Sequence, residues 1–178
     1  LTLRADGLGF SESTIGLIQS AYPVGSLIGC LIAPKLIMRV GHIRIFAAFA
    51  SIASATALIH LVTNDPLSWG AMRLLQGFCF SGLYIVAESW LNGSASNETR
   101  ASLLSTYFIT QTGGVMIGQL LLNLSSPEGI FLFIVVSVLI SFSLVPMLVS
   151  ASAIPPYVPP ERISLAELFR LSPMGLTG

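Results

Sequence analysis

Long apolar runs separated by short polar stretches divide this chain into five segments, which cover residues 15–34, 45–62, 66–87, 101–127 and 129 to about 153. Each segment reaches or approaches the roughly 20 residues that a helix needs to cross a bilayer core about 30 Å thick. Membrane-spanning strands would alternate apolar and polar positions, whereas these runs are apolar on nearly all sides. The pattern therefore predicts an all-α integral membrane protein, a helical bundle in which short loops join antiparallel neighbours.

Composition excludes several classes of function. The chain is 53% hydrophobic and 9% charged, against roughly 25% charged residues in a soluble domain. The apolar composition makes the lipid bilayer the expected partner, and because the net charge is zero we expect no nucleic acid as a partner. Cys30 and Cys79 lie inside apolar segments and form no metal or disulfide pattern, so we expect no metal and no cofactor. No serine is matched to a nearby His or Asp, and we predict that the protein is not an enzyme.

The distribution of Lys and Arg predicts the orientation of the chain in the membrane. One side of the five spans carries six basic residues, namely Lys35, Arg39, Arg44, Arg100, Arg162 and Arg170. The other side carries only Arg4 outside the membrane. Because basic residues are enriched in cytoplasmic loops, the first side is predicted to be cytoplasmic. The residues before position 15 then lie outside the cell, which requires an earlier span, so we expect that the chain lacks its first helix.

The third apolar segment carries the strongest candidate for a binding residue, Arg73, which lies well inside the span. A buried Arg in a membrane is costly unless it faces a cavity or a partner. At about 100° per residue, Gln76, Phe80 and Tyr84 fall on the face of Arg73, with Glu88 at its edge. This polar stripe predicts a substrate cavity. The alternative is an interfacial Arg whose side chain reaches the membrane surface and binds no ligand.

Two other segments offer matching faces for the same cavity. Gln19 and Tyr22 lie in the first segment, and Tyr107 and Gln111 lie in the fourth. Each of these polar side chains needs a partner at depth, which is either a substrate or a hydrogen bond between helices. Small residues allow helices to approach closely, and we assign helix packing to five glycines, which are Gly25, Gly29, Gly77, Gly114 and Gly118.

Several of these residues stand in motifs. The stretch Arg39-Val-Gly41-His-Ile-Arg44 resembles the basic loop motif of the major facilitator superfamily of transporters, although Met38 stands where that family has an acidic residue. Arg73-Leu-Leu-Gln76-Gly77 resembles the fourth-helix motif of the same family. Residues 87–92 and 97–100 are similar to a bacterial, YcaD-like branch of it.

The resemblance implies helices two to six of an expected twelve, which form most of the N-terminal half of a transporter. It implies secondary active transport of a small solute by alternating access across the bacterial cytoplasmic (inner) membrane, as uptake or efflux with H⁺ as the expected coupling ion. The remaining partners would be the missing first helix and the C-terminal half of the same chain. The alternative is a membrane channel or scaffold without coupled transport.

The resemblance also implies a cytoplasmic gate. In the family the basic loop pairs with an acidic residue at the inner end of the fourth helix, and Glu88 is the candidate here. We expect an ionic latch between Glu88 and Arg39 or Arg44, with Gly41 in the loop between them. The alternatives are that Glu88 carries protons or that it solvates the helix end.

The resemblance and the local sequence together predict two parts. Residues 1–150 are the transmembrane bundle lacking its first helix, and residues 151–178 are a cytoplasmic linker between the two halves. The proline-rich stretch 155–160 favours a stiff extended connection. Ser164 and Glu167 have the spacing of a capping box, which predicts a short amphipathic helix before the start of the seventh helix. An ordinary loop is the alternative for this helix.

Overall fold

The computed structural model describes residues 2–122 and 129–149, and these residues form helices and no strands. The helices in chain order are α1 (Thr2–Gly7), α2 (Glu12–Val40), α3 (His42–Val62), α4 (Pro66–Ser94), α5 (Arg100–Leu121), α6 (Phe131–Phe142) and α7 (Leu144–Val149). The prediction of an all-α chain is confirmed. The predicted linker and amphipathic helix lie outside the described residues.

Local sequence signals set the ends of the long helices. Ser11 caps α2, since its side chain accepts a hydrogen bond from the Thr14 backbone N–H at 3.3 Å. Asp65 caps α4 in the same way, at 2.9 Å from the Ser68 nitrogen. Gly41, with φ of 87°, is the single residue between α2 and α3. The predicted basic loop is therefore mostly helical, and one glycine makes the reversal of the chain.

Four stretches of the described chain are long and apolar enough to cross a membrane, namely α2, α3, α4 and the α6–α7 stretch from Phe131 to Val149. The sequence predicts five such spans, and the fourth of them corresponds to α5. With 22 residues, α5 is long enough, but it is not among these four. Its polar residues, Gln111 among them, lower its hydropathy, and the rest of the predicted segment lies in residues 123–128, outside the described ranges.

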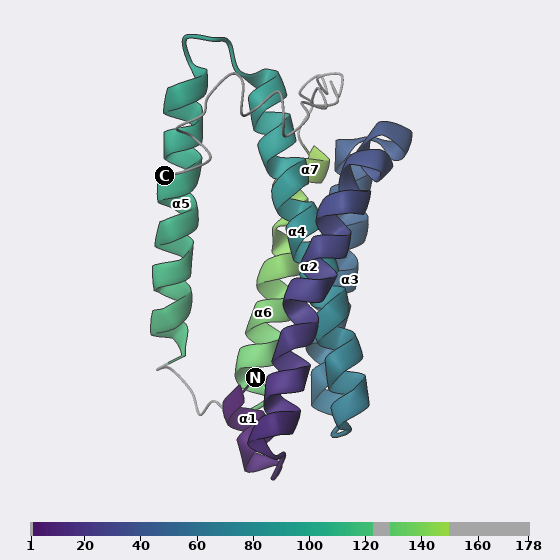
Figure 1. Cartoon of the computed structure of the whole chain (residues 1–178). Helices are drawn as coiled ribbons and strands as arrows, with labels where there is room; N and C mark the ends of the chain where they lie inside the picture. Colours follow the sequence, from purple (N-terminus) through teal and green to yellow (C-terminus); the bar gives the residue numbers. More distant parts are fainter. Residues whose placement is uncertain (1, 123–128, 150–178) are drawn as a thin grey trace, which may run out of the picture.

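The centre of the bundle is the contact between α2 and α4. Helix α3 packs on α4 as well, and α6 packs on α3. Helix α5 stands apart from the bundle, connected to the end of α4, and has no buried residue (Figure 1). The α2–α3 and α4–α5 connections lie at the end of the bundle opposite α1 (Figure 1). Loops that the sequence assigns to the same side of the membrane therefore lie at the same end of the fold.

Two apolar clusters hold the ends of the bundle together. One cluster joins α2, α3 and α4 and includes the fully buried Ala33, Cys79 and Val86. The other joins α1, α2 and α4 through Ala5, Ile18 and Trp69. A further polar contact ties α3 to α6, where the buried Ser54 hydroxyl lies 2.7 Å from the Ser137 hydroxyl.

Large apolar side chains also cover the outside of the fold. Leu17 and Leu31 on α2 are 74% and 66% exposed, and Phe142 on α6 is 66% exposed. Such exposure is unfavourable in water over so many positions but is what lipid-facing helices require. The exposed apolar surface, like the length and composition of the four helices, therefore indicates that the fold lies in a membrane.

Candidate functional site

The start of α4 places Arg73 inside the bundle. Pro66 opens the helix after the Asp65 cap, and the next turn carries Trp69, whose side chain is fully buried. The Trp69 indole N–H donates to the Thr63 carbonyl oxygen at 2.7 Å, which fixes the α3–α4 connection onto the helix. Arg73 follows one turn later and is half-buried among α2, α4 and the cavity described below.

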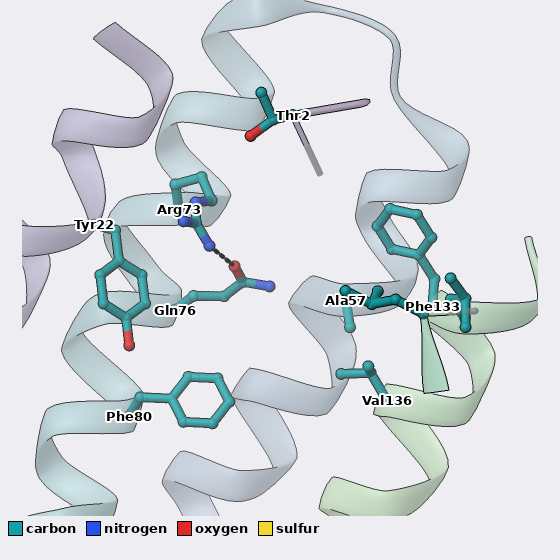
Figure 2. A pocket seen from close by; sticks show the side chains of 10 residues that line it. Thr2, Tyr22, Ala57, Arg73, Gln76, Phe80, Phe133 and Val136 are labelled. Carbon is teal, nitrogen blue, oxygen red and sulfur yellow. Dashed lines mark hydrogen bonds between the residues drawn. The ribbon is translucent and has the colours of Figure 1, made fainter. Parts of the chain in front are cut away.

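Two neutral glutamines hold the Arg73 guanidinium. Its Nη2 donates to Gln19 Oε1 on α2 at 2.6 Å, and its Nη1 donates to Gln76 Oε1 at 3.3 Å, a longer bond that Figure 2 shows. The guanidinium carbon also lies 4.8 Å from the ring centroid of Tyr22, close enough for a cation–π interaction. Arg73 Nε is buried and has no hydrogen-bond partner in residues 2–122 and 129–149. Within the described ranges, no carboxylate pairs with this cation.

The hydrogen-bond chain continues to α1. Gln19 accepts from Arg73 and donates from Nε2 to the Thr2 hydroxyl at 2.9 Å. One amide side chain therefore links α1, α2 and α4 at the end of the bundle that the sequence assigns to the outside. Because both ends of the amide are engaged, Gln19 is fixed in one orientation toward Arg73.

Arg73, Gln76 and Tyr22 line a cavity of about 460 Å³. The described residues that line it are Thr2, Tyr22, Ala57, Arg73, Gln76, Phe80, Leu122, Leu132, Phe133 and Val136. Figure 2 shows the polar side chains of α2 and α4 facing apolar side chains from α3 and α6 across this space. The lining thus combines Arg73 and one amide with mainly hydrocarbon walls, an arrangement typical of small-molecule sites. A second cation, Arg4, lies over the Phe133 wall, with its guanidinium carbon 5.4 Å from the ring centroid.

The structure brings together four of the seven predicted cavity residues. Arg73, Gln76 and Tyr22 line the cavity, and Gln19 contacts Arg73 directly. The other three do not line it. Tyr84 lies farther along α4 and is 43% exposed, while Tyr107 and Gln111 lie on α5.

Sequence reasoning does not identify the apolar wall or the histidine behind it. Phe133 and Val136 are ordinary residues of an apolar run and carry no signal for a site. His60 is fully buried, and its Nδ1 lies 2.7 Å from the Thr56 carbonyl oxygen. Its ring stacks on Phe133 at 6.4 Å between centroids, and its Nε2 has no hydrogen-bond partner among the residues that the structure describes. A buried histidine therefore supports the ring that forms one wall of the cavity.

The predicted gate residues lie at the opposite end of the bundle. Arg39 and Arg44 are exposed, and Glu88 is partly buried. In the part of the chain that the structure describes, Glu88 forms no ion pair with either arginine. At this end of the bundle the start of α3 meets the end of α4, where His42 Nε2 lies 3.1 Å from the Ser89 hydroxyl oxygen. The latch stays a prediction.

The five glycines fall into two groups. A Cβ added to Gly25 would meet the Leu74 carbonyl oxygen, and one added to Gly29 would meet Phe78 and Ser81. A Cβ on Gly77 would meet the Tyr22 carbonyl oxygen from the other side of the same contact. These three glycines thus allow α2 and α4 to touch through their backbones. Gly114 and Gly118 on α5 have no atom of the described chain within 4 Å of such a Cβ.

Comparison with known proteins identifies relatives of this chain. Residues 1–176 match the family model described as Major Facilitator Superfamily. The chain is 30% identical over 134 residues to an uncharacterized MFS-type transporter, YcaD, of Escherichia fergusonii, a match that covers 75% of this chain and 35% of that protein. It is 30% identical over 135 residues to an uncharacterized MFS-type transporter of Yersinia enterocolitica, again covering 75% and 35%. It is 32% identical over 115 residues to the YcaD protein of Salmonella arizonae, covering 64% and 30%.

The match thus spans about a third of the length of these relatives. No solved structure matches the chain. The relatives point to a transporter rather than an enzyme.

Proposed function

Because this chain belongs to the Major Facilitator Superfamily, we propose that the whole protein is a secondary transporter that moves a small solute across the bacterial inner membrane. The chain is a multi-pass membrane protein by its family and its four apolar helices. In the proposal it supplies most of one half of the transporter, and two such halves rock about a central site. H⁺ is the coupling ion in this scheme.

One observation carries the proposal. A cavity of about 460 Å³ opens beside Arg73, whose charge is held by Gln19 and Gln76 and by no carboxylate of the described residues. A cation at this depth is costly when it serves only to join helices, because neutral residues would pack there without desolvating a charge. A solute that enters the cavity would meet that charge.

The contact between α2 and α4 supports rocking of the half as one body. Gly25, Gly29 and Gly77 let the two backbones touch, so the helices have little room to slide or rotate against each other. Ser26 Oγ adds a hydrogen bond to the Gly77 carbonyl oxygen at 3.2 Å. Residues of α2 and α4 that face the cavity would therefore move together when the transporter changes state.

We include the cytoplasmic latch in the proposal. In the inward-closed state Glu88 pairs with Arg39 or Arg44. The His42–Ser89 contact supports this assignment, since it brings the start of α3 next to the residue after Glu88. Glu88→Gln in the full-length protein should shift the population toward the inward-open state. Cysteine labelling of the cytoplasmic cavity would then be faster than in the parent protein, and an unchanged labelling rate would remove the latch.

Counterflow in proteoliposomes tests the proposed function. Vesicles containing the full-length protein are preloaded with an unlabelled solute and diluted into the labelled solute, over a panel of organic acids, sugars and amines. A transporter gives a transient overshoot of label above the outside concentration, and an imposed pH gradient changes its uptake. A channel equilibrates the label without overshoot, and that result for every permeant solute would overturn the proposal.

A further inference from the structure

The charges around the cavity indicate the sign of the charge on its ligand. Arg73 carries a full positive charge, and its hydrogen-bond partners, Gln19 and Gln76, are neutral. Tyr22 adds only the face of its ring. A cationic ligand would be repelled here, and a neutral one would leave the charge unmatched in a medium of low dielectric constant. We infer that the cavity binds a small organic monocarboxylate with an aromatic or similarly apolar body, an inference that rests on the proposed function.

The two hydrogen bonds to glutamine differ in length, so the two terminal nitrogens of the Arg73 guanidinium have different roles. The Nη2 bond to Gln19 is short, at 2.6 Å, and Gln19 is itself tied to Thr2, so this arm is anchored. The Nη1 bond to Gln76 measures 3.3 Å, near the long limit for a hydrogen bond. A carboxylate oxygen of the ligand would therefore bind at Nη1. It would displace the weakly bound Gln76 Oε1 and accept a charge-assisted hydrogen bond in its place.

Gln76 offers a second donor to the same carboxylate. Its amide nitrogen points away from Arg73 (Figure 2). No described residue accepts a hydrogen bond from this nitrogen. A carboxylate between Arg73 Nη1 and Gln76 Nε2 would thus accept one bond from each through its two oxygens. Among the described lining residues Arg73 is the cation, and with these two bonds it matches one carboxylate group.

The opposite wall sets the chemistry of the rest of the ligand. Phe133 and Val136 from α6 face the polar corner across the cavity, and Phe80 lies on α4 next to Gln76 (Figure 2). Aromatic rings pair favourably edge to face or offset, and hydrocarbon gains about 25 cal/mol per Å² that it removes from water. Phe133 is held in place by the His60 ring behind it. A sugar would leave most of its hydroxyls unpaired against these side chains.

Three phenyl compounds of similar shape separate charge from size. Phenylacetate, phenylacetamide and phenethylamine are added to the purified full-length protein, and dissociation constants are measured by titration calorimetry. We expect phenylacetate to bind at least tenfold more tightly than the amide, with no binding of the amine. Arg73→Gln should weaken phenylacetate binding at least tenfold, the range expected for loss of a hydrogen bond to a charged group.

Two variants control for folding and for net charge. Arg73→Lys keeps the positive charge but loses the two terminal nitrogens of the planar guanidinium, so it should retain part of the preference for phenylacetate over the amide. Lys35→Gln removes an exposed cation at the other end of α2, and it should bind phenylacetate as the parent does. Equal affinities for the acid and the amide, absence of phenylacetate binding, or an Arg73→Gln variant that binds as the parent does would overturn the inference.

The same samples distinguish this inference from the proposed function. Phenylacetate binding that depends on Arg73, without counterflow of any solute, would support the carboxylate site and overturn the proposed transport function. Counterflow of sugars or amines with no carboxylate binding would support the proposed transport function and overturn the carboxylate site.

Discussion

Replacing Gly77 by Ala perturbs the closest approach of two helices in the fold. A Cβ at this position would lie 2.9 Å from the Tyr22 carbonyl carbon and 3.0 Å from the Ser26 nitrogen, and closer still to the Tyr22 oxygen. All of these are backbone atoms, so no side chain can rotate away and α2 must separate from α4. The shift would also weaken the hydrogen bond from Ser26 Oγ to the Gly77 carbonyl oxygen.

The expected change in the free energy of unfolding combines two destabilising contributions with one stabilising contribution. Overpacking of this kind costs about 1–3 kcal/mol or more, and a weakened hydrogen bond adds up to about 1 kcal/mol. The better helix propensity of Ala returns at most about 1 kcal/mol. We therefore expect Gly77→Ala to destabilise the full-length protein by about 1–3 kcal/mol on balance.

Unfolding of the purified protein in detergent, followed by tryptophan fluorescence, measures this change. Gly70→Ala is the matched control, because Gly70 lies on the same helix and has nothing within 4 Å of an added Cβ. Gly70→Ala should be neutral or slightly stabilising. Equal stability of the two variants would refute the assignment of Gly77 to the α2–α4 contact.

Two further predictions concern other polar contacts. Ser54→Ala removes the hydrogen bonds that tie α3 to Ser137 on α6 and should cost about 1–2 kcal/mol of stability, measured by the same unfolding assay. Ser143→Ala is the control, because the exposed Ser143 hydroxyl follows α6 and donates to the Ile140 carbonyl oxygen of that same helix, and an equal effect of both variants would contradict the α3–α6 assignment. Gln19→Leu removes the short bond to Arg73 Nη2 and should weaken phenylacetate binding together with stability. A Gln19→Leu variant with the affinity of the parent would show that this glutamine does not position Arg73.

Much of the helical framework could be predicted from the apolar runs, because each long run needs lipid or protein on every side. The ends were harder to place. The stretch between the first two apolar segments resembles a basic loop, whereas α2 continues to Val40 and Gly41 alone makes the reversal. A positive φ at one glycine has no signature in hydropathy, so the turn is seen only in the structure.

The site could be predicted in part for a similar reason. Arg73 and Gln76 stand out because polar side chains are costly inside a membrane span. The pairing of Arg73 with Gln19 depends on how closely α2 approaches α4, which the spacing of residues along one helix does not determine. Phe133 belongs to the uninterrupted apolar stretch 130–136, so its contacts with His60, Arg4 and the cavity distinguish it and its sequence context does not.

Arg73 has no counter-charge among the described residues, and in our proposal it holds a solute carboxylate in the cavity. A structure of the full-length protein with phenylacetate tests this most directly. We predict carboxylate density within hydrogen-bond distance of Arg73 Nη1 and Gln76 Nε2, with the phenyl ring against Phe133. A salt bridge between Arg73 and an acidic side chain of the protein, in a cavity closed to the ligand, would contradict the account.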